Sequence, residues 1–164
     1  MGIQFHSINQ IVHNEIKKKP IDILLISNLC LFLHRSELKL LQAIPFFKNK
    51  NSLMNYKFGD YAVGYLENIF FNSKIDILDN SDYENANVIG DLNLDLTKKI
   101  KKRYDLIIEG GTLEHIFNFP QAISNINNLL KIGGTLYLCT PANNQCGHGF
   151  YQFSPELFFR VYSE

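Results

Sequence analysis

Residues 104–140, YDLIIEGGTLEHIFNFPQAISNINNLLKIGGTLYLCT, contain a complete strand, helix and strand pattern. The first apolar run, residues 104–108, is typical of a strand buried on both faces of a parallel sheet. Pro120 lies near the first position of the predicted helix, and Gly133-Gly134 is expected to end it. A second apolar run, residues 135–140, follows. The stretch therefore predicts one right-handed βαβ crossover.

The rest of the chain repeats this alternation of short apolar runs and helical patterns. Further strands are predicted at residues 21–26 (IDILLI), 75–78 and 87–89. Helices are predicted over residues 3–16, from an N-cap at Ser36 through Ala43, from about Gly59 onward, and from Pro155 onward. We therefore expect a single α/β domain over residues 1–164, with a doubly wound, Rossmann-like, mostly parallel sheet of about five strands and helices on both faces.

The composition disfavours some classes of binding partner and favours one cellular compartment. The 164 residues carry 16 basic and 16 acidic side chains, so no net charge favours nucleic-acid binding. No basic N-terminal region precedes an apolar core, and no run of about 18 apolar residues predicts a membrane span. Cys30, Cys139 and Cys146 form no CxxC pair, which argues against a disulfide framework or a metal site. We expect a cytoplasmic protein.

Acidic residues follow two neighbouring predicted strands. Asp79 follows the strand at 75–78, from where a carboxylate can accept hydrogen bonds from both hydroxyls of a ribose. Asp91 follows the strand at 87–89, and with Leu92 it suits the amino group and ring face of adenine. The alternative is that both aspartates are ordinary turn residues. Their order along the chain favours an adenosine site.

Two other predicted strand ends differ in whether glycines follow the strand. Gly110-Gly111 follows the strand at 104–108 and permits close approach of a ligand to the backbone, although a tight turn before Thr112 explains it equally well. Residues 27–31, SNLCL, follow the first strand and contain neither GxGxxG nor GxxxxGK[ST]. Their absence disfavours dinucleotide and triphosphate ligands, including the nicotinamide cofactor of a dehydrogenase.

Residues 74–164 resemble the class I S-adenosylmethionine-dependent methyltransferases, and within them a subgroup of bacterial methyltransferase-domain proteins. The resemblance rests on IDILDNSDYENANVIGDLN, on the stretch from YDLIIEGGTLEH to LLKIGGTLYLCTPANN, and on HGFYQFSPELF. The last of these is the most specific to the subgroup. Residues 27–31 depart from the family's glycine-rich turn, and the family's sheet continues beyond the helix at Pro155, so we expect this domain to lack the last strands.

The resemblance implies a cofactor, S-adenosylmethionine, and a site for it. Asp79 would hold the ribose hydroxyls, Asp91 and Leu92 would contact adenine, and Glu109 and Gly110 would line the methionine end. Ser27, Asn80 and Gly111 complete the predicted cofactor-binding set.

Two histidines are the candidates for a general base that deprotonates the methyl acceptor. His115 follows the fourth predicted strand and His148 lies in the loop after the fifth; each has a purely structural alternative. We expect methyl transfer to a small-molecule or glycan-type acceptor. The alternative is a non-catalytic scaffold that forms a homo-oligomer or binds a partner subunit through an exposed sheet edge.

Overall fold

The computed structural model describes residues 2–15, 21–43 and 55–163. Its elements, in chain order, are β1 (Gly2–Gln4), α1 (Phe5–Glu15), β2 (Asp22–Ile26), β3 (Cys30–Phe32), α2 (Arg35–Gln42), α4 (Val63–Ile69), β4 (Lys74–Asp79), β5 (Val88–Ile89), β6 (Tyr104–Glu109), the 3-10 helix η2 (Leu113–His115), α5 (Phe119–Leu129), β7 (Leu130–Leu138) and α6 (Pro155–Val161). Among the described residues, no helix is long and apolar enough to span a bilayer.

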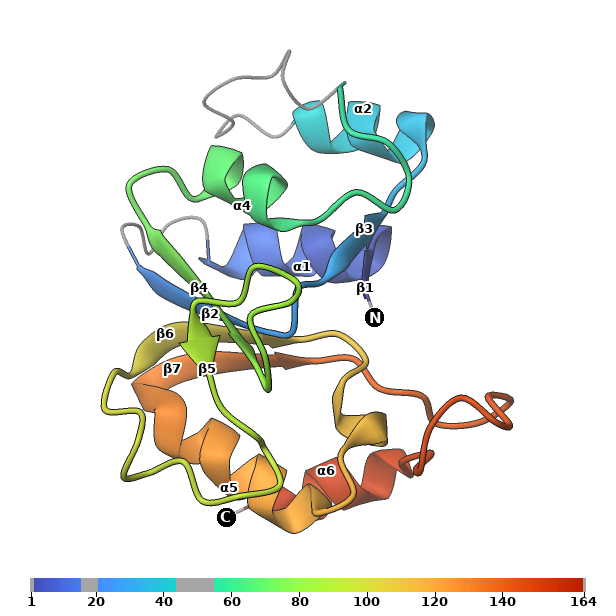
Figure 1. The fold of residues 1–164 in the computed structure, drawn as a ribbon. Coiled ribbons are helices and arrows are strands. Elements are labelled where there is room, and N and C mark those ends of the chain that lie inside the picture. Colours follow the sequence, from blue (N-terminus) through green and yellow to red (C-terminus); the bar gives the residue numbers. More distant parts are fainter. Residues whose placement is uncertain (1, 16–20, 44–54, 164) are drawn as a thin grey trace.

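The main sheet has five strands in the order β5-β4-β2-β6-β7, and every neighbouring pair is parallel. The strand β2 lies in the centre, where Leu25 is opposite Ile77 of β4 and Ile108 of β6. This sheet, with helices on both faces, confirms the predicted doubly wound α/β fold (Figure 1).

Each face of the sheet has its own core because side chains alternate along a strand. Ile23 and Leu25 of β2 pack with buried residues of α1, α2 and α4, whereas Leu24 and Ile26 pack with α5. Figure 1 shows α1, α2 and α4 on one side of the sheet and α5 and α6 on the other. The continuous apolar run of β2 is therefore explained by burial on both faces.

A second, two-stranded parallel sheet was not predicted. In it β1 pairs with β3, with Gly2 opposite Cys30 and Gln4 opposite Phe32. The predicted helix at 3–16 accordingly begins only at Phe5, and its last predicted residue lies outside the described residues. The N–H of Gly2 also donates to the carbonyl of Gly110 (2.8 Å), which places this small sheet beside the carboxyl end of β6.

The boundaries of two helices differ from the prediction. His34, not Ser36, is the N-cap of α2, because the carboxylate of Glu37 accepts the His34 N–H (2.8 Å). The helix predicted from about Gly59 begins at Val63, since the preceding Tyr61 instead forms an isolated antiparallel bridge with Cys30 of β3.

The end of α5 also differs. Gly133-Gly134 does not end this helix, because α5 finishes at Leu129 and β7 starts at the next residue. Both glycines lie inside β7, where the pairing with β6 is irregular: Leu130 is opposite Tyr104, but Thr135 is opposite Leu106. Gly133 has a positive φ of 77°, a conformation that glycine adopts without the steric cost of a side chain.

Candidate functional site

A cavity of about 160 Å³ lies at the carboxyl ends of β2, β4 and β5. Ligands of open α/β sheets bind at this edge. Six of the residues predicted from the sequence line this cavity: Ser27, Asp79, Asn80, Asp91, Leu92 and His115. They come from four separate segments of the chain, so the fold brings together what the sequence separates.

Ser27 forms the wall of the cavity at the end of β2. Its φ of 64° lies in the left-handed region, which residues other than glycine rarely adopt. Its N–H donates to the carbonyl of Leu78 at the end of β4 (2.8 Å), and the next side chain, Asn28, donates to the carbonyl of Glu84 (2.8 Å). The turn after β2 contains no glycine and is instead formed by a serine in a strained backbone conformation, together with these hydrogen bonds.

The two aspartates keep one oxygen each in local turns. Oδ1 of Asp79 accepts the Asn80 N–H (2.7 Å), and Oδ1 of Asp91 accepts both the backbone N–H and the side-chain amide of Asn93 (2.9 Å each). Within the described ranges, neither Oδ2 has a hydrogen-bond partner of the chain. Both aspartates are therefore turn residues, as the alternative held, and each also has an oxygen left for a ligand.

Asn125 of α5 holds the loop that carries Asp91. Its side chain donates to the carbonyls of Leu92 (3.1 Å) and Leu94 (2.7 Å) and accepts the N–H of Leu96 (3.0 Å). It is only 1% exposed. We did not predict this residue, although an asparagine on the apolar stripe of a helix, between Ala122 and Leu129, is a signal that could have identified it.

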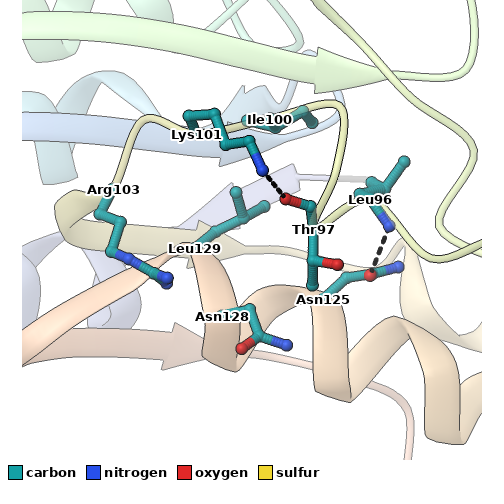
Figure 2. A pocket seen from close by; sticks show the side chains of 8 residues that line it. All are labelled: Leu96, Thr97, Ile100, Lys101, Arg103, Asn125, Asn128 and Leu129. Carbon is teal, nitrogen blue, oxygen red and sulfur yellow. Dashed lines mark hydrogen bonds between the residues drawn. The ribbon is translucent and has the colours of Figure 1, made fainter.

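Asn125 also borders a second, smaller cavity of about 100 Å³ (Figure 2). Its lining includes Lys101 and Arg103, and the Lys101 ammonium donates to the carbonyl of Thr97 (2.8 Å). This cavity adjoins the segment that leads into the amino end of β6, which is the opposite edge of the sheet from the ligand-binding edge. We therefore take the first cavity as the candidate site.

Glu109, predicted at the methionine end of the cofactor, turns inward instead. Its Oε1 accepts the backbone N–H groups of Gly111 (2.9 Å), Thr112 and Leu113 (3.1 Å). Burial raises the pKa of Glu109 to about 7, and the nearby charge of Glu114 adds to this, although the three hydrogen bonds oppose it. The carboxylate thus fixes the turn that enters η2.

The glycines after Glu109 are also used by the chain itself. A Cβ on Gly110 would lie 3.1 Å from the carbonyl oxygen of Gly2 and 3.2 Å from the side chain of Leu29. Gly111 has a φ of 98°, as a tight turn requires. Neither glycine lines the candidate cavity, nor does Glu109, and their role toward a cofactor stays a prediction.

The two candidate bases lie side by side. His115 ends η2 and lines the cavity, and its ring centroid is 5.1 Å from that of His148 in the loop after β7. Nε2 of His148 is 3.5 Å from Oε1 of Glu114. His148 thus lies beside His115 without lining the cavity itself, and Glu114, which the sequence analysis does not single out, lies next to His148.

Comparisons with known proteins bear on this chain only slightly. No family model and no curated protein matches the sequence. Among solved structures, TehB from Haemophilus influenzae is similar in fold, with 14% identity and a TM-score of 0.47. The match covers 94% of this chain and 49% of that one, so this chain spans about half the length of TehB. The assignment of the fold rests on the order and direction of the strands.

Proposed function

We propose that the cavity binds the adenosine part of S-adenosylmethionine and that the protein transfers its methyl group to a small-molecule or glycan-type acceptor. The observation that carries the proposal is that Asp79 and Asp91, at the ends of adjacent strands, line one cavity. In this proposal Asp79 accepts from the ribose hydroxyls, Asp91 accepts from the adenine amino group, and Leu92 contacts the ring. We place this activity in the cytoplasm.

The cavity is too small to enclose the whole cofactor. Pockets that enclose drug-sized ligands have volumes of roughly 300–1,000 Å³. A cavity of about 160 Å³ encloses a smaller group. The methionine part of the cofactor would then lie outside the enclosed volume.

Besides positioning the acceptor, the protein can assist methyl transfer with a general base, and the two histidines are the candidates for it. The sulfonium carbon is already activated, so holding the acceptor in line gains most of the rate. Where the acceptor must lose a proton, a base such as His115 or His148 adds about 10²–10⁴-fold. His115 lines the cavity, and the ring of His148 lies beside that of His115, with 5.1 Å between the ring centroids.

Calorimetric titration with S-adenosylmethionine and S-adenosylhomocysteine tests the proposal. We expect saturable binding that Asp79→Ala weakens by about 10–100-fold, because a hydrogen bond to a charged group contributes about 1.5–3 kcal/mol. Asp95→Ala is the matched control: Asp95 also accepts a local backbone N–H, from Thr97, but is exposed and outside the cavity. Absence of binding at millimolar ligand, or equal loss in both variants, contradicts the proposal.

A non-catalytic, partner-binding domain is the second candidate function. This function is favoured by the observation that Glu109 and Gly110 contact other residues of the chain and do not line the cavity. An apolar groove along the edge strand β7, lined by Leu136, Leu138 and Phe158, offers a surface for a second copy or a partner subunit. Light scattering across a dilution series distinguishes the two: a monomer at every concentration counts against a homo-oligomer.

A further inference from the structure

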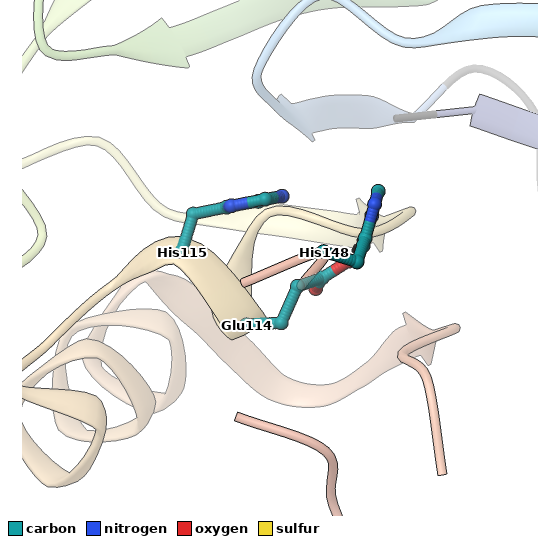
Figure 3. Close-up of side chains that lie close together, drawn as sticks. All are labelled: Glu114, His115 and His148. Carbon is teal, nitrogen blue, oxygen red and sulfur yellow. Dashed lines mark ion pairs between the residues drawn. The ribbon is translucent and has the colours of Figure 1, made fainter. Parts of the chain in front are cut away.

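Glu114, His115 and His148 form a cluster of metal-ligand side chains. One oxygen or nitrogen atom of each lies within 4.8 Å of the others. Figure 3 shows the side chains extending toward one another, two from η2 and one from the loop after β7. Because the third member is distant in sequence from the adjacent pair, no motif spacing revealed the cluster.

The glutamate of the cluster is a buried carboxylate with an unsatisfied oxygen. The side chain of Glu114 is 2% exposed, and its Oε2 has no hydrogen-bond partner within the part of the chain that the structure describes. Its Oε1 is 3.5 Å from Nε2 of His148. A buried carboxylate without full compensation is costly, and a cation beside it removes that cost.

The loop that carries His148 is fixed to Glu114 through the backbone. The carbonyl of Glu114 accepts the N–H groups of Phe150 (2.7 Å) and Tyr151 (3.2 Å). Between these residues and His148, a Cβ on Gly149 would lie only 2.7 Å from the same carbonyl oxygen. The Tyr151 hydroxyl donates to the carbonyl of Phe117 (2.6 Å), a second attachment. His148 is therefore presented to Glu114 by a held loop.

We propose that Glu114, His115 and His148 form a binding site for a divalent metal ion of the zinc type. Two imidazoles and one carboxylate suit zinc and its first-row neighbours, and three protein ligands leave a position open for water or substrate. Bonds of about 2.0–2.2 Å bring ligand atoms closer together than they lie here, so the two exposed histidine rings must rotate inward on binding.

The metal site shares His115 and His148 with the proposed methyl transfer, in which either histidine is a candidate base, and a ring nitrogen that holds the ion is not free to accept a proton. His115 lines the adenosine cavity, whereas Glu114 and His148 do not. A bound ion would join η2 to the loop after β7 at the edge of that cavity. Metal binding does not require S-adenosylmethionine to bind, so each proposal can fail without the other.

Titration of chelator-treated protein with Co²⁺ and with Zn²⁺ tests the site. We expect one ion per chain, with visible absorption bands of Co²⁺ in a nitrogen and oxygen environment, displaced by Zn²⁺. His115→Ala and His148→Ala should each weaken binding by at least about 100-fold, because loss of an outer-shell partner alone costs about 10–100-fold. His148 lies in an exposed loop, so its variant retains the fold.

Two controls separate this site from adventitious binding. His13→Ala removes an exposed histidine whose ring contacts its own helix at Asn9, and Cys146→Ser removes a free thiol from the same loop as His148. Both should bind Co²⁺ and Zn²⁺ like the unchanged protein. The proposal is overturned if the unchanged protein takes up no stoichiometric ion, or if both histidine variants retain full affinity.

Discussion

The N–H of Gly2 donates a hydrogen bond to the carbonyl of Gly110, with 2.8 Å between the two atoms. Through this bond the N-terminal strand β1 covers the turn after β6, next to the edge of the sheet where ligands bind. The space left by the missing side chain of Gly110 is thus filled by Gly2 and Leu29 of the same chain.

Gly110→Ala should displace β1. The added Cβ would lie 3.1 Å from the Gly2 carbonyl oxygen, which is closer than ordinary contact. We expect a loss of about 1–3 kcal/mol in the free energy of unfolding, typical of overpacking. Denaturant titration measures it, and hydrogen exchange should show faster exchange of the β1 and β3 amides. Unchanged protection of these amides would refute the role of Gly110.

Asn125→Ala should loosen the loop that carries Asp91. The change leaves the carbonyls of Leu92 and Leu94 and the N–H of Leu96 without their side-chain partner, at a cost of about 2–3 kcal/mol. We also expect weaker S-adenosylmethionine binding. The control is Asn128→Ala on the same helix, since this amide is exposed and its hydrogen bonds are local, to Ser124. Equal stability of the two variants would contradict the role of Asn125.

Glu109→Gln should remove a dependence of stability on pH. The folded pKa of about 7 lies above the usual value of 4.5, so the folded protein holds a proton that the unfolded chain releases. Stability from this group is complete below about pH 4.5 and is lost as the pH rises through 7. With chelator present, the free energy of unfolding should fall between pH 5 and about 7 more steeply than in Glu109→Gln. Parallel profiles would show that the carboxyl does not titrate in this range.

Lys102→Met should destabilise the sheet at the amino ends of its strands, the side opposite to the candidate cavity. Lys102 pairs with Asp76 (2.7 Å) and Asp22 (3.2 Å) at the amino ends of β4 and β2. Desolvation raises the pKa of Asp76, but hydrogen bonds from Lys102, Asn87 and Tyr104 outweigh it, and the pKa is lowered overall. Because Lys102 is more than a third exposed, we expect a loss of about 1 kcal/mol at neutral pH.

That loss should disappear in acid. A lowered carboxylate pKa contributes stability above the unfolded value of about 3.8, and this stability is lost as the pH falls through the folded pKa. Denaturant titrations at pH 7 and at pH 2 therefore compare the two regimes. Lys101→Met is the control, because the Lys101 ammonium donates its hydrogen bond to the backbone carbonyl of Thr97, which does not titrate. A loss that persists unchanged at pH 2 would exclude the ion pairs as its cause.

The sequence predicted the main sheet because burial on both faces leaves continuous apolar runs, such as residues 23–26 of β2. It did not predict β1 and β3, since strands of three residues carry too short a pattern and their pairing joins distant segments. Gly133-Gly134 was interpreted as a helix end for a related reason: glycines that permit a bulge and glycines that stop a helix look alike in sequence.

The sequence predicts best those residues of the candidate site whose positions are fixed by the end of a strand. Asp79 directly follows one predicted strand and Asp91 lies two residues after the end of another, so their meeting at one cavity follows from the topology. The inward turn of Glu109, the reach of Asn125 and the approach of His148 to Glu114 depend on loop conformation and side-chain rotation, which apolar periodicity does not encode.

The bulge in β7 determines how another chain can attach to this molecule. An edge strand with regular geometry presents a row of backbone groups to which a foreign strand can add, and a bulge interrupts that row. In β7 the interruption lies at Gly133-Gly134, near the amino end of the strand. Continuous extension of the sheet by a foreign strand is thus blocked there. A partner strand at this edge can pair with the backbone only along the regular part, residues 135–138, and must contact the rest of β7 through side chains.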